Sequence, residues 1–232
     1  LKKERIIGTD LIFLRELTGG IYFGKRGRKD NGNTAFDTCT YKRSEIIRLA
    51  KKGFEFAMKR SKKLCCVDKA NVLESSRLWR ETVQSMEKDY PDVKVSYEFV
   101  DAVAMRLVQW PNSYDVLITE NLFGDILTDE ASVISGSMGL MPSASLGNKT
   151  SLFEPIHGSY PQAAGKNIAN PLATILSAAM MFEDAFSLKE EANLIREVVN
   201  KSLEKSIVTE DLSDGKKSYS TSEVGDWLVN QI

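Results

Sequence analysis

The chain has 232 residues, of which 42% are hydrophobic and 27% charged, and its 31 lysines and arginines nearly balance 32 aspartates and glutamates. This composition predicts a globular protein with a sizeable core, in one large or two smaller domains, and the near-neutral charge argues against nucleic-acid binding. No apolar run is long enough to cross a bilayer, no signal-peptide pattern is present, and the three cysteines lack metal-ligand spacing, so we expect a cytoplasmic protein with no membrane partner.

Strand-like apolar runs alternate with helical periodicity along the chain, which is typical of an α/β protein. We expect strands over Asp10–Leu14, Ile21–Phe23, Lys63–Asp68, Val93–Phe99 and Asp115–Thr119. We expect one helix capped by Ser44, and others over about Ser75–Lys88, Ala102–Trp110, Leu122–Ile134, Pro171–Phe186, Lys189–Ser206 and Ser222–Gln231. The polar stretch Lys25–Thr40 is predicted as an excursion or hairpin arm, and the stretch Gly136–Asn170, rich in Gly, Ser, Pro and Asn, as a functional loop.

The glycine-rich segment Thr18–Gly24 lacks the Gly-x-Gly-x-x-Gly spacing of a dinucleotide-binding turn, and no helical pattern follows it. We therefore predict a non-Rossmann fold. Arg15 precedes this segment and could bind a carboxylate, while Tyr22 lies within it and could donate a proton. Taken alone, each is more readily explained as a structural residue, an ion-pair partner or a strand side chain.

Lys69 follows an apolar strand, at a position where α/β proteins commonly build sites, and a lysine there can act as a base. A lysine that simply extends to water is the alternative. Asp101 opens a predicted helix, and its spacing alone indicates an N-cap. The single histidine, His157, stands before Gly158 and Ser159, which would let backbone and hydroxyl groups approach a ligand; a plain turn explains them equally well.

Asp125 and Asp129 lie four residues apart in the apolar, helix-compatible segment Asn121–Asp129. On a helix they share a face, and their like charges repel by about 0.2–0.5 kcal/mol. A hard divalent cation such as Mg²⁺ or Mn²⁺ between them would remove that repulsion. The alternative for the pair alone is a solvated acidic helix face.

Taken together, four segments resemble the isocitrate/isopropylmalate dehydrogenase family of β-decarboxylating dehydrogenases, and its isopropylmalate branch most of all. The segments are Arg15–Gly24, Lys69–Leu73, Asn121–Asp129 and Phe153–Pro171, and they follow in family order along essentially the whole chain. The resemblance implies an isopropylmalate-dehydrogenase-like two-domain α/β fold. It also implies the oxidative decarboxylation of (2R,3S)-3-isopropylmalate to 4-methyl-2-oxopentanoate in leucine biosynthesis, with NAD and Mg²⁺ or Mn²⁺, by a homodimer with shared active sites.

The resemblance assigns roles to individual residues. Lys69 would be the general base for the substrate hydroxyl, and Tyr22 would help to protonate the enolate carbon. Arg15 would bind the malate carboxylate, and Val72 would lie beside the isopropyl group. The metal ligands would be Asp101, Asp125 and Asp129, and the partner subunit would supply both Asp101 and Lys69.

The cofactor region implied by the resemblance is the loop from Glu154 to Asn170. The implied cofactor-binding residues are Asn71, Glu154, His157, Gly158, Ser159, Gln162 and Asn170. Gln162 departs from the family pattern, because NAD-using members carry an aspartate there that binds the ribose hydroxyls and repels a 2′-phosphate. Glutamine accepts a hydrogen bond from the ribose but carries no charge that repels the 2′-phosphate of NADP. We still expect NAD as the cofactor, with weaker discrimination against NADP.

By the same resemblance, residues 1–135 form the central substrate and dimerisation domain, with an arm near residues 25–40, and residues 136–232 form the C-terminal part of the nucleotide-binding domain. The family's leading strands and substrate-selecting helix would precede Leu1, so we expect an N-terminally truncated chain that is weakly active or inactive alone. The alternatives are a related isocitrate, homoisocitrate or tartrate dehydrogenase, and a noncatalytic subunit that supports a complete partner.

Overall fold

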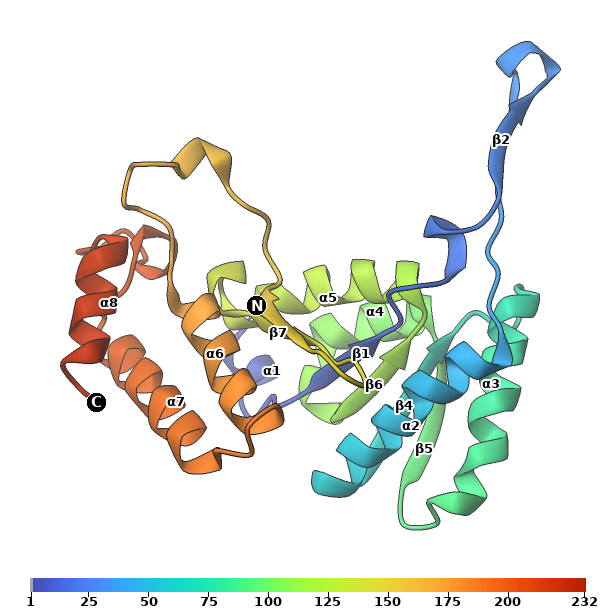
Figure 1. The fold of residues 1–232 in the computed structure, drawn as a ribbon, viewed down its shortest axis with the longest axis horizontal. Helices are drawn as coiled ribbons and strands as arrows, with labels where there is room; N and C mark the ends of the chain where they lie inside the picture. The colour runs from blue at the N-terminus through green and yellow to red at the C-terminus, as the bar shows by residue number, and fades with distance from the viewer. Residues whose placement is uncertain (1) are drawn as a thin grey trace. The chain divides into compact units, whose positions relative to one another are not determined.

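The computed structural model describes residues 2–232 and divides the chain into two compact units, Leu1–Ala131 and Ser132–Ile232 (Figure 1). Both units combine helices with strands, and the sheet of the first unit is parallel, which confirms the predicted α/β class. Helix α5 (Asn121–Ser135) runs from the first unit into the second. Within residues 2–232, none of the helices has the length and apolar character needed to cross a membrane.

The first unit is built on a parallel four-stranded sheet in the order β1–β6–β4–β5. Its strands are β1 (Ile12–Arg15), β4 (Lys63–Asp68), β5 (Lys94–Phe99) and β6 (Val116–Thr119). The inner strands β4 and β6 are buried almost throughout, which explains their continuous apolar sequences. Because all strands run the same way, the residues that follow them meet at one edge of the sheet, hereafter the carboxyl edge.

Helices cover both faces of this sheet (Figure 1). Helices α2 (Arg43–Lys59) and α3 (Glu74–Met86) lie on one face, and α4 (Val100–Gln109) and the start of α5 lie on the other. Phe54 of α2 and Trp79 of α3 are fully buried in the core against the sheet. A Cβ atom at Gly53 would lie 2.5 Å from Ile118 Cγ2, so this glycine allows α2 to approach β6 closely.

The opposite edge of the sheet is held by a buried carboxylate. Asp115, directly before β6, accepts hydrogen bonds from Arg60 Nε at 2.5 Å, from the Ser61 amide at 2.9 Å and from the Ser61 hydroxyl. Desolvation raises the pKa of the Asp115 carboxyl, but the hydrogen bonds from Ser61 and Arg60 outweigh it, so the pKa lies below its ordinary value.

We expect this carboxylate to make the first unit sensitive to acid. Because the folded-state pKa of Asp115 is depressed, its contribution to stability is present above the unfolded-state pKa of about 3.9 and is lost as the pH falls through the folded value. Urea unfolding between neutral pH and about pH 2 should therefore show a smaller loss of unfolding free energy in Asp115→Asn than in the unmodified chain. Parallel pH profiles for the two proteins would contradict this prediction.

The predicted hairpin arm is confirmed. Strands β2 (Arg26–Lys29) and β3 (Thr34–Asp37) pair antiparallel and project from the first unit, with nearly all of their residues exposed (Figure 1). A short helix, α1 (Lys3–Ile6), precedes β1.

Three local predictions in this fold were wrong. Residues Ile21–Phe23 form no strand; Gly20–Tyr22 is a 3₁₀ turn, and Gly20 at φ 78° packs so closely on Tyr41 that a Cβ atom would clash with it. Helix α2 begins at Arg43 rather than after Ser44, and the Glu45 carboxylate accepts a hydrogen bond from the Lys42 amide at 2.8 Å. The stretch Gly136–Asn170 is not all loop, because it contains the antiparallel hairpin of β7 (Pro142–Ser145) and β8 (Leu152–Pro155).

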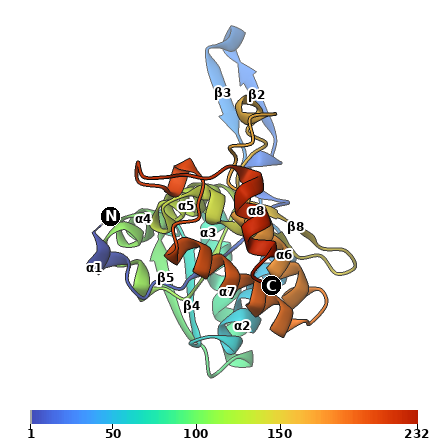
Figure 2. The same cartoon turned by 90° about the vertical axis from the view of Figure 1, so that its left-hand side faces the viewer.

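The second unit consists of that hairpin and three helices, α6 (Leu172–Asp184), α7 (Lys189–Glu204) and α8 (Thr221–Val229). Helix α6 contacts both the hairpin and α7, and α7 contacts α8, an order that can be followed in Figure 2. Its core contains Leu172, Val198, Val199, Val224 and Leu228. Ser220 caps α8 by accepting from the Glu223 amide and donating to the Glu223 carboxylate, so this end is fixed by local sequence.

Candidate active site

Arg15, Tyr22 and Asp125 come together at the carboxyl edge of the sheet. Arg15 Nη1 lies 2.7 Å from Asp125 Oδ1, and the Tyr22 hydroxyl donates a hydrogen bond to Asp125 Oδ2 at 3.0 Å. Asn121 holds the other side of the guanidinium, since its carbonyl oxygen accepts from Arg15 Nε at 3.0 Å and its Oδ1 accepts from Nη2 at 2.9 Å. Three functional groups therefore lie together: the Arg15 guanidinium, which can bind a carboxylate, the Tyr22 phenol and the Asp125 carboxylate.

Glycine makes this arrangement possible. A Cβ atom at Gly124 would lie 2.6 Å from Arg15 Cγ and 2.4 Å from Thr119 Oγ1. Only a residue without a side chain lets α5 lie this close to the end of β1. The motif residues Asn121 and Gly124 thus have positioning roles that the sequence alone did not assign to them.

The electrostatics of this group keep the phenol protonated. The hydrogen bond to Asp125 raises the pKa of Tyr22, and desolvation and the negative charge of Asp125 act in the same direction. The Asp125 side chain remains 45% exposed, so its oxygens are open to a ligand.

Lys69 and Asp101 form a second group at the same edge. Lys69 Nζ lies 2.5 Å from Asp101 Oδ1 and 5.6 Å from the centre of the Phe99 ring. The hydrogen bond from Lys69 lowers the pKa of the Asp101 carboxyl, and backbone amides at the start of α4 lower it further. The predicted N-cap role of Asp101 was wrong, because α4 begins at Val100 with Phe99 as its N-cap, but its carboxylate still interacts with the helix start.

The structure does not unite the three predicted metal ligands within one chain. Asp125 and Asp129 are on α5, four residues apart, whereas Asp101 is on α4. Across residues 2–232, no three His, Cys, Asp or Glu side chains come together as a metal-ligand set. Within the described residues, the three aspartates therefore do not form one ligand set.

The turn after Lys69 carries two further predicted residues. Asn71 and Val72 are both exposed, and 61% of the Val72 surface is open to solvent. An aliphatic side chain beside a lysine on an exposed turn provides an apolar contact for a ligand or a second chain.

The predicted nucleotide loop lies in the second unit. Glu154 is in β8, and Gly158, Ser159 and Gln162 are exposed residues of the segment that follows. His157 Nδ1 lies 2.9 Å from the Gly158 carbonyl oxygen, and a Cβ atom at Gly158 would meet nothing within 4 Å. The loop therefore presents backbone groups, a hydroxyl and an amide with open space in front of Gly158.

Asn170, at the end of this loop, is held by its neighbours. Its Oδ1 accepts from the Leu172 amide at 2.9 Å, at the start of α6, and its Nδ2 donates to Asp211 Oδ2 at 3.0 Å. Asp211 also accepts from the Ser137 and Thr209 hydroxyls, each at 2.5 Å. Desolvation raises the pKa of the Asp211 carboxyl, but these hydrogen bonds outweigh it and lower the pKa overall. Asp211 is distant in sequence and in no motif, so sequence reasoning missed it.

Removing the Asp211 carboxylate should loosen the second unit. In Asp211→Ala, the amide of Asn170 and two hydroxyls lose their acceptor, so we expect a loss of about 1 kcal/mol of unfolding free energy. Urea unfolding measures this loss, and the matched control is Asp226→Ala, which removes an exposed carboxylate from a regular helical position in α8. Equal stabilities for the two variants would refute the role of Asp211.

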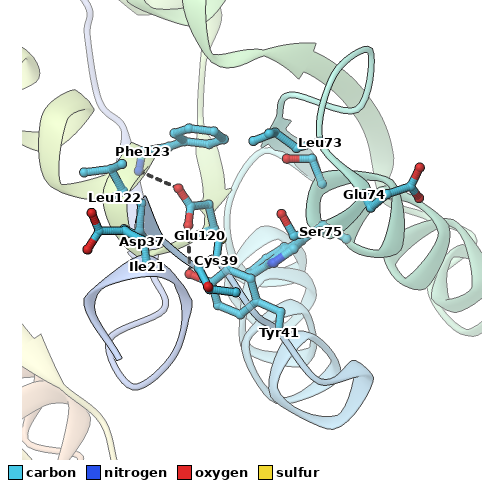
Figure 3. A pocket seen from close by; sticks show the side chains of 13 residues that line it. Ile21, Asp37, Cys39, Tyr41, Leu73, Glu74, Ser75, Glu120, Leu122 and Phe123 are labelled. Atoms are coloured by element: carbon cyan, nitrogen blue, oxygen red, sulfur yellow. Dashed lines mark hydrogen bonds between the residues drawn. The ribbon is translucent and has the colours of Figure 1, made fainter. Parts of the chain in front are cut away.

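The first unit also contains a cavity of about 440 Å³ (Figure 3). Its walls include Ile21, Leu73 and Phe123, which are close in sequence to Tyr22, Val72 and Asp125. The buried Glu120 carboxylate accepts hydrogen bonds from the Tyr41 hydroxyl at 2.8 Å and the Phe123 amide at 2.9 Å. Desolvation raises the pKa of Cys39 on the same wall, which keeps the thiol protonated. No predicted site residue lines this cavity among those the structure describes.

Comparison with known proteins gives this geometry a context. The family described as isocitrate/isopropylmalate dehydrogenase matches residues 1–228. The 3-isopropylmalate dehydrogenase of Bacteroides fragilis is 56% identical over 233 residues, which covers 100% of this chain and 65% of that protein. That of Desulfitobacterium hafniense is 53% identical, over 99% of this chain and 65% of that protein. The chain thus spans about 65% of the length of these curated relatives.

Solved structures agree with the sequence relatives. Isocitrate dehydrogenase from Methylococcus capsulatus is 35% identical with a TM-score of 0.90, covering 97% of this chain and 69% of that one. A β-decarboxylating dehydrogenase from Thermococcus kodakarensis is 35% identical with a TM-score of 0.81, covering 94% of this chain and 63% of that one. On its sequence, its fold and the arrangement of its motif residues, the chain belongs to the isocitrate/isopropylmalate dehydrogenase family.

Proposed function

We propose that the protein oxidatively decarboxylates (2R,3S)-3-isopropylmalate to 4-methyl-2-oxopentanoate with NAD, as a step of leucine biosynthesis. The observation that carries the proposal is the direct contact of Arg15 and Tyr22 with the two oxygens of Asp125 at the carboxyl edge of the sheet. The names of the relatives that are more than half identical over this chain support the choice of substrate.

Arg15 and Tyr22 have complementary tasks in this reaction. The Arg15 guanidinium binds the malate carboxylate, and Asn121 fixes its orientation through hydrogen bonds to Nε and Nη2. The raised pKa of Tyr22 keeps its hydroxyl proton in place until the enolate carbon of the decarboxylated substrate accepts it.

Lys69 accepts the proton of the substrate hydroxyl as a neutral amine, after its ammonium form has released one proton to solvent. Its ammonium group lies beside the Phe99 ring and against Asp101, so its position is defined before substrate arrives. Val72, directly after Asn71 and largely exposed, offers an aliphatic surface to the isopropyl group.

The donor set fits a hard divalent cation. Asp125, Asp129 and Asp101 all provide carboxylate oxygens, and Mg²⁺ and Mn²⁺ prefer such ligands. Asp125 is half exposed and Asp129 and Asp101 are exposed, so all three are open to a ligand. When bound, Mg²⁺ or Mn²⁺ lowers the pKa of the substrate hydroxyl and stabilises negative charge on its oxygen.

The exposed loop from Glu154 to Asn170 fits a nucleotide. The open space in front of Gly158 leaves room for a ligand, and the polar groups of His157, Ser159 and Gln162 can form hydrogen bonds with a sugar and a phosphate. Asn71, beside Lys69, would contact the nicotinamide end. NAD, when bound, accepts the hydride from the substrate carbinol carbon. The Asn170 side chain is already hydrogen-bonded to Asp211 and to the Leu172 amide, so it fixes the end of the loop. Asn170 would therefore contact the cofactor through its backbone.

The separation of the two groups supports a homodimer with shared active sites. Because Asp101 does not join Asp125 and Asp129 within a chain, we propose that Lys69 and Asp101 of one subunit complete the site of the other. Exposed apolar side chains on α4 and α5, including Met105 at 61% and Ile126 at 56%, supply a surface for that contact. The three cysteines, all free, fit a cytoplasmic location.

Initial rates of NAD reduction test the proposed function. The chain is assayed with 3-isopropylmalate, isocitrate, homoisocitrate and tartrate, with Mg²⁺, Mn²⁺ or EDTA, and with NADP in place of NAD. We expect turnover of 3-isopropylmalate, dependent on metal and faster with NAD. Preferred turnover of another substrate would shift the activity to a related dehydrogenase. Metal binding without any turnover would support a noncatalytic subunit.

A further inference from the structure

The turn that carries Lys69 is anchored by a buried carboxylate. Asp68, the last residue of β4, is 1% exposed. Its Oδ2 accepts from Arg80 Nε at 2.8 Å, and its Oδ1 accepts from Arg80 Nη2 at 3.0 Å and from the Ala70 amide at 2.9 Å. A single carboxylate thus joins the end of β4, helix α3 and the residue directly after Lys69.

The rest of the turn backbone is held as well. The Lys69 carbonyl oxygen accepts from the amides of Val72 and Leu73, both at 2.9 Å. The Ala70 carbonyl oxygen accepts from Arg77 Nε at 2.9 Å. With the backbone fixed on both sides of Lys69, the direction of its side chain is set by Asp68 and α3 rather than by a flexible loop.

Arg80 also acts on the Lys69 side chain through an aromatic ring. Phe99 is the register partner of Asp68 in the neighbouring strand. The Arg80 guanidinium lies 5.3 Å from the centre of the Phe99 ring, and Lys69 Nζ lies 5.6 Å from it. Two cations therefore share one ring, and the bidentate pair with Asp68 compensates the charge of Arg80, so that both can remain there.

We propose that Asp68 and Arg80 are positioning residues for Lys69. The inference rests on the proposed role of Lys69 as the general base. Asp68 is fully buried and Arg80 is 28% exposed, and an ion pair with a buried member is costly to desolvate, so stability alone does not account for this pair. The contact of Asp68 with Ala70, directly after Lys69, and that of Arg80 with Phe99, the ring near Lys69 Nζ, do account for it, because a small displacement of a reacting group costs much of its rate.

Variants of this pair have a matched control at the opposite edge of the sheet. The test variants are Asp68→Asn, Arg80→Met and Arg80→Lys. The control variants are Asp115→Asn and Arg60→Met, because Asp115 is also buried and also paired with an arginine. We expect kcat to fall by about 10–100-fold in Asp68→Asn and Arg80→Met, with KM for 3-isopropylmalate and NAD within about twofold. Arg80→Lys should recover part of the loss, since it keeps the charge but not the bidentate geometry. The two control variants should keep kcat.

A second measurement reports the position of Lys69 without any turnover. Reductive methylation with ¹³C-formaldehyde labels lysine amines, and the signal that disappears in Lys69→Arg identifies the methyl groups of Lys69. The Phe99 ring should shift this signal upfield, and the shift should shrink in Asp68→Asn and Arg80→Met but persist in Asp115→Asn. An unmoved signal together with kcat equal to that of the control variants would overturn the positioning role. A signal that moves as expected, in a protein that does not turn over 3-isopropylmalate at all, would support the positioning role and refute the proposed reaction.

Discussion

Replacement of Lys69 by methionine should lower kcat by about 10²–10⁴-fold, the range that a positioned general base contributes. Methionine keeps an unbranched side chain beside Phe99 but has no amine to accept the substrate proton and none to pair with Asp101. Steady-state rates at saturating 3-isopropylmalate, NAD and Mg²⁺ measure the loss. The Kd for NAD should remain within about twofold, because Lys69 would act on the substrate hydroxyl rather than on the nucleotide.

Chemical rescue separates a lost base from a damaged structure. Small primary amines added to Lys69→Met should restore part of the rate in proportion to their concentration and basicity. Lys63→Met is the matched control, since it removes an exposed lysine from the opposite end of the same strand. A Lys69→Met protein with more than about a tenth of the normal kcat would rule out Lys69 as the base.

The second large effect is expected for Asp125→Asn. The change removes the charge from a carboxylate that pairs with Arg15 and accepts from Tyr22, and it removes one proposed metal ligand. We expect the affinity for Mn²⁺ to fall by more than about 100-fold, beyond the effect of changing an outer-shell partner, and activity to fall with it. Electron paramagnetic resonance of free Mn²⁺ during titration measures this affinity directly.

Two further results accompany that substitution. The pKa of Tyr22 should fall toward its ordinary value, because the carboxylate that raises it is replaced by a neutral amide. The titration of Tyr22 in this variant is obtained by subtracting the titration curve of the double variant Asp125→Asn/Tyr22→Phe from that of Asp125→Asn. Glu130→Gln on the same helix is the matched control and should keep Mn²⁺ affinity. Unchanged Mn²⁺ binding in Asp125→Asn would exclude the aspartate from the metal site.

Much of the first unit is predictable from the sequence because its signals are local. The inner strands β4 and β6 are continuous apolar runs, and the helices show clear periodicity, so the parallel sheet and its carboxyl edge follow. Ile21–Phe23 resembles a strand in sequence because β-branched and aromatic residues favour strands, whereas the backbone there is decided by the packing of Gly20 on Tyr41.

The candidate site was predictable only where a motif carries it. Arg15, Tyr22 and Asp125 could be named in advance, but their contacts join residues more than 100 positions apart in the sequence. Asp211 and Arg80 have no sequence signature at all, because each is recognisable only by what it touches: Asp211 by Asn170, and Arg80 by Asp68 and Phe99. Side-chain clamps of this kind depend on tertiary packing, which a single sequence does not encode in a readable pattern.

The division of the site into two groups, Arg15 with Asp125 and Lys69 with Asp101, leads to a genetic consequence. In the proposed two-fold dimer, a Lys69→Met chain and an Asp125→Asn chain are each defective alone, yet together they assemble one pocket from their undamaged halves and one pocket that carries both lesions. Unfolding and refolding an equal mixture of the two inactive proteins should then produce about a quarter of normal activity, since half of the dimers are mixed and each has one working pocket. For the same reason, a cell that expresses both the Lys69→Met and the Asp125→Asn alleles should regain part of the activity that each allele lacks alone.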